Sequence, residues 1–305
     1  MIESPDRNEL SRKIRELKKE RNAVILAHNY QIGEVQDIAD FIGDSLELSQ
    51  KAAAVAEDVI VFCGVHFMAE TAHILSPDKT VLLPDLHAGC PMADMISAAE
   101  LIAWKKTYPG RPVVSYVNTS AEVKAESDIC CTSSNAVRVV ESLPGREILF
   151  VPDRNLAAYV SRYSSKTLIP WDGYCYVHNN ILAHDIREKK KTYPEAEVWA
   201  HPECRPEVID LADKVLSTGK MIKEAGITES REIIVATEVG ILYRLKKENP
   251  SKNFYPAHEM AFCANMKKIT LKKVYLSLDE MVHRVVVPPD VAARARGAIE
   301  KMIKL

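Results

Sequence analysis

The amino-acid sequence predicts an α/β protein made of three similar parallel-sheet units. Three short segments that begin with lysine and end with proline recur along the chain, and their prolines, Pro84, Pro170 and Pro256, stand 86 and 86 residues apart. The histidines His28 and His201 are separated by 173 residues, which is about two of these periods. A fixed repeat of this length indicates architecture more securely than local propensity does.

The first strand of each unit is predicted from an apolar run that ends in a polar residue able to bind a ligand. These runs are residues 24–28, 113–118 and 197–201. They end at His28, Asn118 and His201. Ligands of parallel sheets bind beyond the carboxyl ends of the strands, so we expect these side chains to project into one site.

A short segment that ends in hydroxyl residues follows in each unit and opens into an amphipathic stretch of helical period. These segments are residues 43–45, 131–134 and 216–219. Serine is a natural helix N-cap, so Ser45, Ser133 and Ser217 are expected to begin the helices. The next runs, at residues 58–62, 147–151 and 232–236, are apolar and rich in β-branched residues. They are typical of strands buried on both faces.

Each unit then continues with a second helix and a last strand. The helical patterns cover residues 68–75, 156–162 and 241–247, and the last strands are expected at 79–84, 166–170 and 252–256. Strands that alternate with helices predict parallel α/β layers. We expect a first domain from residues 1–93 together with 266–305, a second from 94–179 and a third from 180–265.

Composition and charge exclude several classes of protein. The 305 residues carry 40 basic and 42 acidic side chains, a net charge of -2, which disfavours nucleic acid as a main partner. No apolar run approaches the roughly 20 residues that span a bilayer, so no membrane segment is expected. Residues 1–7 do not contain a signal-peptide core. We therefore expect a cytoplasmic protein.

The seven cysteines divide by their position in the repeat. Cys90, Cys175 and Cys263 each follow a repeated proline, with intervals of 85 and 88 residues. An odd count in a cytoplasmic chain argues against structural disulfides. The remaining cysteines share no pattern. Three of them are interpreted as small buried hydrophobic residues, namely Cys63, Cys130 and Cys131. Cys204 is left open between local packing and an indirect role in a site.

The cysteines in phase predict one shared metal site. Tripling of an ancestral unit also explains their spacing, but their flanking residues differ widely while the thiol persists. Three thiolates without a Cys-x-x-Cys knuckle do not resemble a structural zinc finger. A [4Fe-4S] cluster fits, with three cysteine ligands and one iron left open for substrate. Zinc held by three thiolates and a water is the rival, and ligand softness does not separate the two.

A set of motifs in order along the chain resembles the quinolinate synthase family over nearly the whole length. The first are Ala27-His-Asn-Tyr-Gln31, Gln36-Asp-Ile-Ala-Asp40, Gly43-Asp-Ser45, Tyr116-Val-Asn118 and Thr132-Ser-Ser-Asn135. The later ones are Pro152-Asp-Arg-Asn-Leu156, His201-Pro-Glu-Cys204, Ser217-Thr-Gly219 and Met260-Ala-Phe-Cys-Ala-Asn-Met-Lys267. The chain has Ser134 where the family often has alanine, and Tyr176 where it often has proline. Neither departure removes an expected ligand.

The resemblance implies three similar α/β domains around a pseudo-threefold axis, with a [4Fe-4S] cluster held by Cys90, Cys175 and Cys263. It also implies condensation of iminoaspartate with dihydroxyacetone phosphate to quinolinate, phosphate and water, for de novo NAD synthesis. A separate enzyme would supply the iminoaspartate. The substrate residues that it implies are His28, Ser45, Tyr116, Val117, Asn118, Ser133, His201, Pro202, Glu203 and Thr218.

The residues themselves suggest how such a site works. Hydroxyl groups at helix N-termini, including Ser217 and Thr218, suit a dicarboxylate and a phosphate. Glu203 is our candidate general base, with a pKa that we expect burial to raise. Tyr30 and Tyr116 are expected to donate protons or align substrate. The role of His178 is left open. The alternatives are a zinc- or iron-dependent lyase or hydrolase, and a non-enzymatic iron-sulfur sensor.

Overall fold

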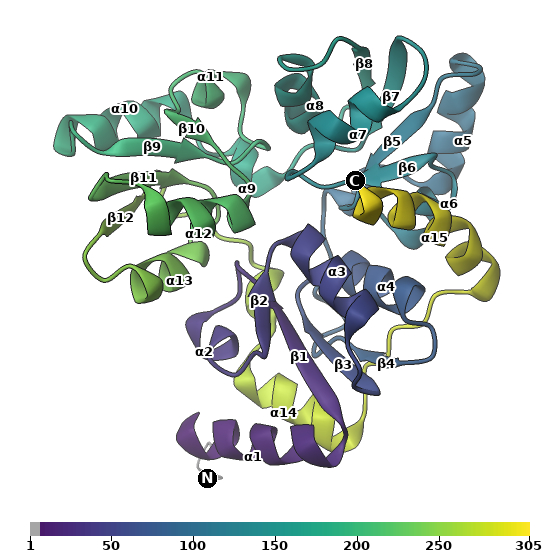
Figure 1. The fold of residues 1–305 in the computed structure, drawn as a ribbon, viewed down its shortest axis with the longest axis vertical. Coiled ribbons are helices and arrows are strands. Elements are labelled where there is room, and N and C mark those ends of the chain that lie inside the picture. Colours follow the sequence, from purple (N-terminus) through teal and green to yellow (C-terminus); the bar gives the residue numbers. More distant parts are fainter. Residues whose placement is uncertain (1–6) are drawn as a thin grey trace.

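The computed structural model describes residues 7–305 and contains three four-stranded parallel sheets, which form three lobes around a common centre (Figure 1). The strand orders are β2-β1-β3-β4, β6-β5-β7-β8 and β10-β9-β11-β12. In each sheet the first strand of the unit lies between the second and the third. All the pairings are parallel. The predicted α/β class with three similar units is confirmed.

The strands match the expected runs closely, because buried β-branched segments leave little choice of register. The first sheet contains β1 Ala23–His28, β2 Phe41–Gly43, β3 Val59–Cys63 and β4 Thr80–Leu82. The second contains β5 Val113–Tyr116, β6 Ile129–Cys131, β7 Glu147–Val151 and β8 Thr167–Pro170. The third contains β9 Glu197–Ala200, β10 Lys214–Val215, β11 Glu232–Ala236 and β12 Asn253–Pro256.

Helices cover the sheets and join the lobes. The first lobe has α1 Arg7–Glu20, α2 Gly33–Gln36, α3 Ser45–Ala54 and α4 His66–Leu75. The second has η1 Ala93–Met95, α5 Ala98–Thr107, α6 Ala121–Ala125, α7 Ala136–Ser142, α8 Arg154–Ser161 and α9 Tyr176–Asn179. The third has α10 Ala183–Thr192, α11 Pro206–Ile209, α12 Thr218–Ile227 and α13 Ile241–Glu248. The chain closes with η2 Met266–Lys268, α14 Leu271–Glu280 and α15 Pro289–Lys304.

The helix caps differ from the prediction in two of the three units. Ser217 is the N-cap of α12 and accepts a hydrogen bond from the Lys220 N–H, as expected. Ser45 is instead the first residue of α3, because Asp44 caps that helix by accepting from two backbone N–H groups. Ser133 does not begin a helix either. The Asn135 side chain accepts from the Thr132 N–H and holds a turn before α7.

Each sheet contains the same aspartate contact between its first and second strands. Asp40, Asp128 and Asp213 each accept a hydrogen bond from the strand N–H that lies 15 residues earlier, at 2.8, 2.7 and 2.8 Å. Their own N–H groups donate to the carbonyl of the same strand residue. The aspartate therefore satisfies an N–H group and a carbonyl of the first strand just before the short second strand begins. This shared contact explains why an aspartate recurs at this position in all three units.

The repeated lysines have a shared structural role. Lys79, Lys166 and Lys252 stand just before the last strand of each unit. Each Nζ donates to one or two backbone carbonyls in the last turn of a preceding helix or just beyond its end. Carbonyls at a helix C-terminus lack partners within the helix. A long cationic side chain satisfies them and favours the negative end of the helix dipole.

The C-terminal helices reach two different lobes. α14 lies beside α1, whereas α15 packs against α6 and β6 of the second lobe as well as α4 of the first (Figure 1). Asn135 Nδ2 donates to the Met302 carbonyl at 3.1 Å, which ties α15 to the second lobe. The limits 1–93 with 266–305, 94–179 and 180–265 stay a prediction.

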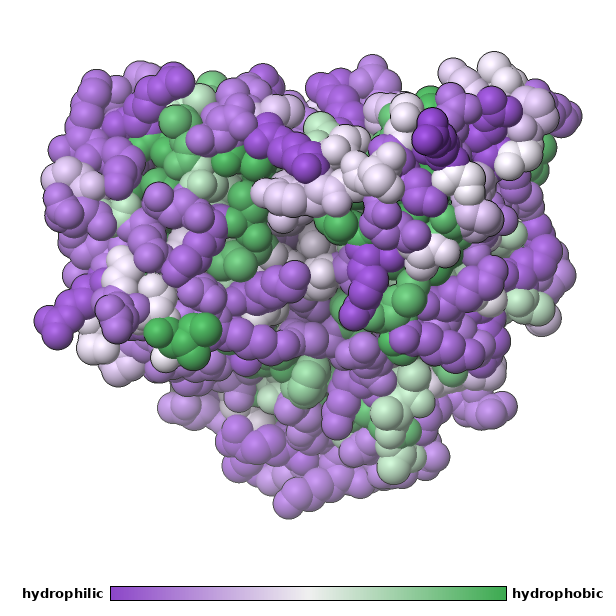
Figure 2. Space-filling view, turned by 45° about the horizontal axis from the view of Figure 1, so that its top comes forward, coloured by the Kyte–Doolittle hydropathy of each residue, from purple (hydrophilic) through white to green (hydrophobic). Residues whose placement is uncertain are grey.

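The surface is mostly hydrophilic on the face shown in Figure 2, with apolar residues in small separate patches. Among residues 7–305, the helices lack the combination of length and apolar character that a bilayer span needs. The expectation that residues 1–7 contain no signal-peptide core concerns a segment of which the structure describes only Arg7.

Candidate functional site

The three lobes line one cavity with residues from the carboxyl ends of their first strands. Most of the residues singled out from the sequence are on its wall: His28, Tyr30, Ser45, Cys90, Tyr116, Asn118, Ser133, Cys175, His201, Glu203, Thr218 and Cys263. Val117, Pro202 and Ser217 are buried but do not line it. Asp44, His178, Glu238 and Met266 also line the cavity. Sequence reasoning had left His178 open and had not singled out the other three.

Each lobe contributes one cysteine to this cavity. Cys90 lies between β4 and η1, Cys175 precedes α9, and Cys263 lies between β12 and η2. All three are partly accessible, whereas the other four cysteines are fully buried. Cys204 Sγ donates to the Ala236 carbonyl at 3.3 Å, so it packs against β11. The three cysteines that recur with the repeat are thus the ones that reach the cavity, whereas the other four are packed in the cores.

Buried carboxylates hold the backbone of two of these cysteines. Asp153 Oδ2 accepts from the Cys175 N–H at 3.2 Å, and Glu238 Oε1 accepts from the Cys263 N–H at 2.9 Å. Asp153 and Glu238 are 85 residues apart, which is close to the period of the repeat. Both acids are 0% exposed. The contact is therefore a repeated feature of the second and third lobes, and it orients the loop that carries each thiol.

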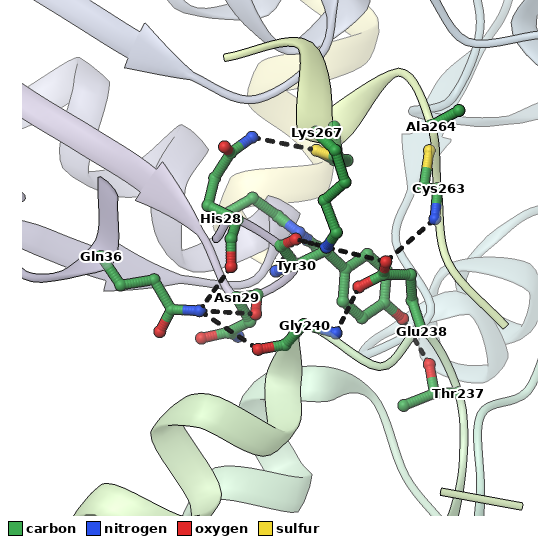
Figure 3. A network of polar contacts seen from close by, with 12 residues as sticks. His28, Asn29, Tyr30, Gln36, Thr237, Glu238, Gly240, Cys263, Ala264 and Lys267 are labelled. Carbon is green, nitrogen blue, oxygen red and sulfur yellow. Dashed lines mark hydrogen bonds and ion pairs between the residues drawn. The ribbon is translucent and has the colours of Figure 1, made fainter. Parts of the chain in front are cut away.

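Glu238 extends its contact to the first lobe, as Figure 3 shows. Its Oε1 lies 2.8 Å from Lys267 Nζ, and its Oε2 accepts from the Gly240 N–H at 2.7 Å. Lys267 Nζ also donates to the Tyr30 carbonyl. The side chain of Tyr30 returns to the third lobe, because its hydroxyl lies 2.5 Å from Thr237 Oγ1. Cys263 and Tyr30 are thus positioned by one connected network.

His28 and His201 occupy equivalent places in the first and third lobes. In each case the Nδ1 atom accepts from the backbone N–H two residues later, at 3.2 Å for Tyr30 and 3.3 Å for Glu203. Burial lowers the pKa of both histidines to about 3. Both rings are therefore neutral near neutral pH, and the shared contact leaves the Nε2 atom of each free to act on a ligand.

Glu203 lies against two histidines from different lobes. Its Oε2 atom is 2.5 Å from His178 Nδ1 and 3.5 Å from His201 Nδ1. The expectation of a raised pKa for Glu203 is wrong, because its net pKa is lowered. Burial does act to raise the pKa, but the charge of His178 and its hydrogen bond outweigh it and lower the pKa. Glu203 is therefore a carboxylate at neutral pH. His178, whose role the sequence left open, is the main cause of this low pKa.

Two tyrosines face this carboxylate as protonated phenols. Burial and the charge of Glu203 raise the pKa of both Tyr30 and Tyr116. Asn118, two residues after Tyr116 at the end of β5, has a buried Oδ1 without a hydrogen-bond partner among the described residues. A buried acceptor without a partner is costly unless a ligand satisfies it. The wall thus offers both donors and an acceptor to a polar substrate.

The far side of the cavity is formed by helix N-termini from two lobes. α3 and α12, each of 10 residues, begin at Ser45 and Thr218 on the cavity wall. The helix dipole and the first N–H groups, which the caps Asp44 and Ser217 leave unbonded, favour an anion there. Behind them the three lobes meet through short polar contacts: Ser134 Oγ lies 2.7 Å from Asp44 Oδ2 and 2.8 Å from Ser217 Oγ. Ser134, a departure from the family pattern, therefore joins the lobes.

Comparisons with known proteins show the family of this chain. The family model described as Quinolinate synthetase A protein matches residues 12–304. A quinolinate synthase of Dehalococcoides mccartyi is 61% identical over 296 residues, which cover 97% of this chain and 98% of that protein. Quinolinate synthase of Thermodesulfovibrio yellowstonii is 56% identical and covers 95% of this chain and 96% of its own. Quinolinate synthase 2 of Methanosarcina acetivorans is 54% identical, with 97% and 96% covered. The chain belongs to the quinolinate synthase family.

Proposed function

We propose that this chain condenses iminoaspartate with dihydroxyacetone phosphate to quinolinate, phosphate and water, with a [4Fe-4S] cluster bound by Cys90, Cys175 and Cys263. The observation that carries the proposal is the convergence of one cysteine per lobe on a cavity with paired acid-base groups and helix N-termini. Both substrates are anionic and small, which suits such a cavity. A cytoplasmic location and a separate enzyme that supplies iminoaspartate belong to the same proposal.

The spacing of the thiols supports a cluster over a single zinc ion. Ligand atoms on one tetrahedral zinc lie within about 3.8 Å of one another when the Zn–S distance is about 2.3 Å. Among residues 7–305, the group of three potential ligands whose atoms lie within 4.8 Å of one another is Cys175, His178 and Glu203, and the three thiols do not form such a group. Three thiols on one cavity at wider spacing fit a larger, multi-iron group.

Three residues would hold the cluster, and the rest of the wall would handle the substrates. Burial raises the pKa of the Cys90 thiol to about 12, and coordination to a metal would deprotonate it. The cluster, when bound, supplies a Lewis-acidic iron without a cysteine ligand. The remaining chemistry is assigned to protein side chains within the same cavity.

Proton transfer is assigned to Glu203 and the histidines beside it. The carboxylate is ionised at neutral pH, so it can accept a proton from a substrate carbon during enolisation or dehydration. His178 Nδ1, 2.5 Å from Glu203 Oε2, stabilises that charge. Neutral His28 and His201 accept backbone hydrogen bonds at Nδ1, so each presents an Nε2–H that can donate to a leaving hydroxyl group. Tyr30 and Tyr116, with their raised pKa values, act as hydrogen-bond donors that orient the substrate.

Substrate anions are assigned to the opposite wall. Ser45, Ser133 and Thr218 offer hydroxyl groups, and the first turns of α3 and α12 offer backbone N–H groups to a phosphate or carboxylate. Asn29 Nδ2 donates to Thr218 Oγ1 at 3.1 Å, which fixes the rotamer of that hydroxyl. Asn118 would accept from a substrate hydroxyl or imine N–H.

An anaerobic assay tests this proposal. The reconstituted chain is incubated with both substrates, and quinolinate and phosphate are measured together. Equal amounts of the two products, formed only when both substrates are present, are expected. Phosphate without quinolinate would support a simple lyase, and binding without any product would support a sensor.

A further inference from the structure

We propose that Cys175, His178 and Glu203 form a binding site for a single divalent cation of the zinc type, which is occupied when the cluster is absent. Their ligand atoms all lie within 4.8 Å of one another. The inference rests on the proposed function only in one respect: Cys175 is also proposed as a cluster ligand, so the ion and the cluster exclude one another.

The three donors come together because two lobes meet at this point. Cys175 precedes the short helix α9, and His178 lies within it three residues later. Residues three apart on a helical turn lie on the same side. Glu203 arrives from the loop that follows β9 of the third lobe. The side chains of His178 and Glu203 are only 2% and 4% exposed, so the site is almost closed to solvent.

The contacts of His178 with Thr237 and Tyr30 involve only its Nε2 atom. Its Nε2 atom lies 2.8 Å from Thr237 Oγ1 and 3.2 Å from the Tyr30 hydroxyl. Histidine ligands commonly engage their second nitrogen with a partner in this way, which fixes the ring for coordination. Nδ1 therefore faces Glu203. The buried Glu203 Oε1 has no hydrogen-bond partner among the described residues, so the carboxylate has capacity for a further contact.

The donor set suits zinc or a chemically similar ion. One sulfur, one nitrogen and one oxygen are common zinc ligands, and a water would complete four-coordination. A thiolate and a carboxylate together neutralise a divalent ion, which a nearly closed site requires. Binding releases the Cys175 thiol proton and the proton between His178 Nδ1 and Glu203 Oε2. It also opens their 2.5 Å contact, because two ligands of one zinc lie about 3.3 Å apart. The ion thus takes the place of the close His178–Glu203 contact.

The consequence is a competition during maturation of the protein. Zinc that reaches the cluster-free chain captures Cys175 and withholds it from iron. Cluster assembly is then blocked until the zinc is removed, even though Cys90 and Cys263 remain free.

Cobalt(II) is the probe that tests this site. Full-length protein is stripped of iron under anaerobic conditions and titrated with Co²⁺, whose thiolate charge-transfer band and intense visible bands report sulfur ligation and four-coordination. Cys90→Ser and Cys263→Ser are the matched controls: both are expected to lose the cluster and to bind one Co²⁺ per chain as the wild type does. Cys175→Ser is expected to lose both.

Variants of the other two donors separate the ion from the cluster. His178→Ala and Glu203→Gln are expected to bind Co²⁺ at least about tenfold more weakly and still to bind a full complement of iron and sulfide on reconstitution. X-ray absorption at the zinc edge of the wild-type chain needs no variant, and one sulfur with nitrogen and oxygen neighbours is expected.

Several results would overturn the inference. Zinc with three sulfur neighbours, or Co²⁺ binding that requires Cys90 and Cys263, would assign the ion to the three-thiol site. Unchanged Co²⁺ affinity in both His178→Ala and Glu203→Gln would also reject it. The proposed function fails separately, through absence of a cluster or of quinolinate in the wild type, whatever the cobalt titration gives.

Discussion

Glu238 and Lys267 form an ion pair at 2.8 Å in which the carboxylate is almost wholly buried, and this pair links two parts of the cavity wall. Glu238 also accepts from the Cys263 N–H, while Lys267 donates to the Tyr30 carbonyl (Figure 3). A thiol of the third lobe and a phenol of the first are therefore held by the same two side chains. Neither residue is proposed to touch the substrate, so both are positioning residues.

Replacement of Glu238 tests this link. Glu238→Gln removes a charged acceptor from buried donors, and we expect the free energy of unfolding to fall by about 2 kcal/mol. Urea denaturation of the cluster-free chain measures the change. Asp172→Asn is the control, because exposed Asp172 pairs with Arg154 at 2.5 Å and such pairs contribute at most about 1 kcal/mol. Equal effects in the two variants would contradict a special role for Glu238.

The cysteine assignment is tested by single substitutions. Cys90→Ser, Cys175→Ser and Cys263→Ser are each expected to lose the brown chromophore and most of the iron, because each removes one of the thiolates that hold the cluster. Cys63→Ser and Cys130→Ser are expected to keep both, since their thiols are fully buried in the cores away from the cavity. Iron and sulfide analysis of anaerobic protein gives the answer. Full iron in any of the first three variants refutes the ligand set.

Loss of acid-base groups is expected to affect turnover without affecting the cluster. Glu203→Gln and His201→Ala should each reduce quinolinate formation by about 100-fold or more. His258→Ala is the control, because this histidine does not line the cavity. If both cavity variants turn over as fast as the wild type with the cluster intact, the catalytic centre lies elsewhere.

The buried histidines make stability depend on pH. The folded pKa of His28 and His201 is about 3, below the ordinary value of 6.5. The unfolded chain therefore binds more protons between these values, and stability falls as pH falls from about 6.5, by up to about 1.4 kcal/mol per pH unit for each histidine. Urea midpoints of the wild type and of His28→Gln measure this. The variant should lose less stability on acidification, and parallel curves would contradict the account.

The sequence predicted the buried parts of the fold best. The runs at 147–151 and 232–236 coincide with β7 and β11, because β-branched segments buried on both faces have one stable register. The second strands have only two or three residues, too few for a pattern. Ser45 was expected to cap α3, but its neighbour Asp44 competes better, since its carboxylate accepts from two N–H groups at once.

Residues of the candidate site that recur with the repeat could be predicted from the sequence. Contacts that form where two lobes meet could not. The pKa of Glu203 depends on His178, which comes from another lobe and has no periodic partner in the sequence. Glu238 was missed although it follows a buried strand closely, where a polar residue is a recognisable signal. Lys267 ends a motif that was noticed, but its contact with Tyr30 spans 237 residues and is visible only in the structure.

The central claim is that three thiols from three lobes hold a cluster on which quinolinate formation depends. One measurement tests it most directly: iron, sulfide and the rate of quinolinate formation are determined anaerobically on the same samples, over a series from cluster-free to fully reconstituted chain. We predict that the rate rises in proportion to cluster content, up to about four irons and four sulfides per chain. A fully reconstituted chain that forms no quinolinate, or a cluster-free chain that forms it at the same rate, would contradict the account.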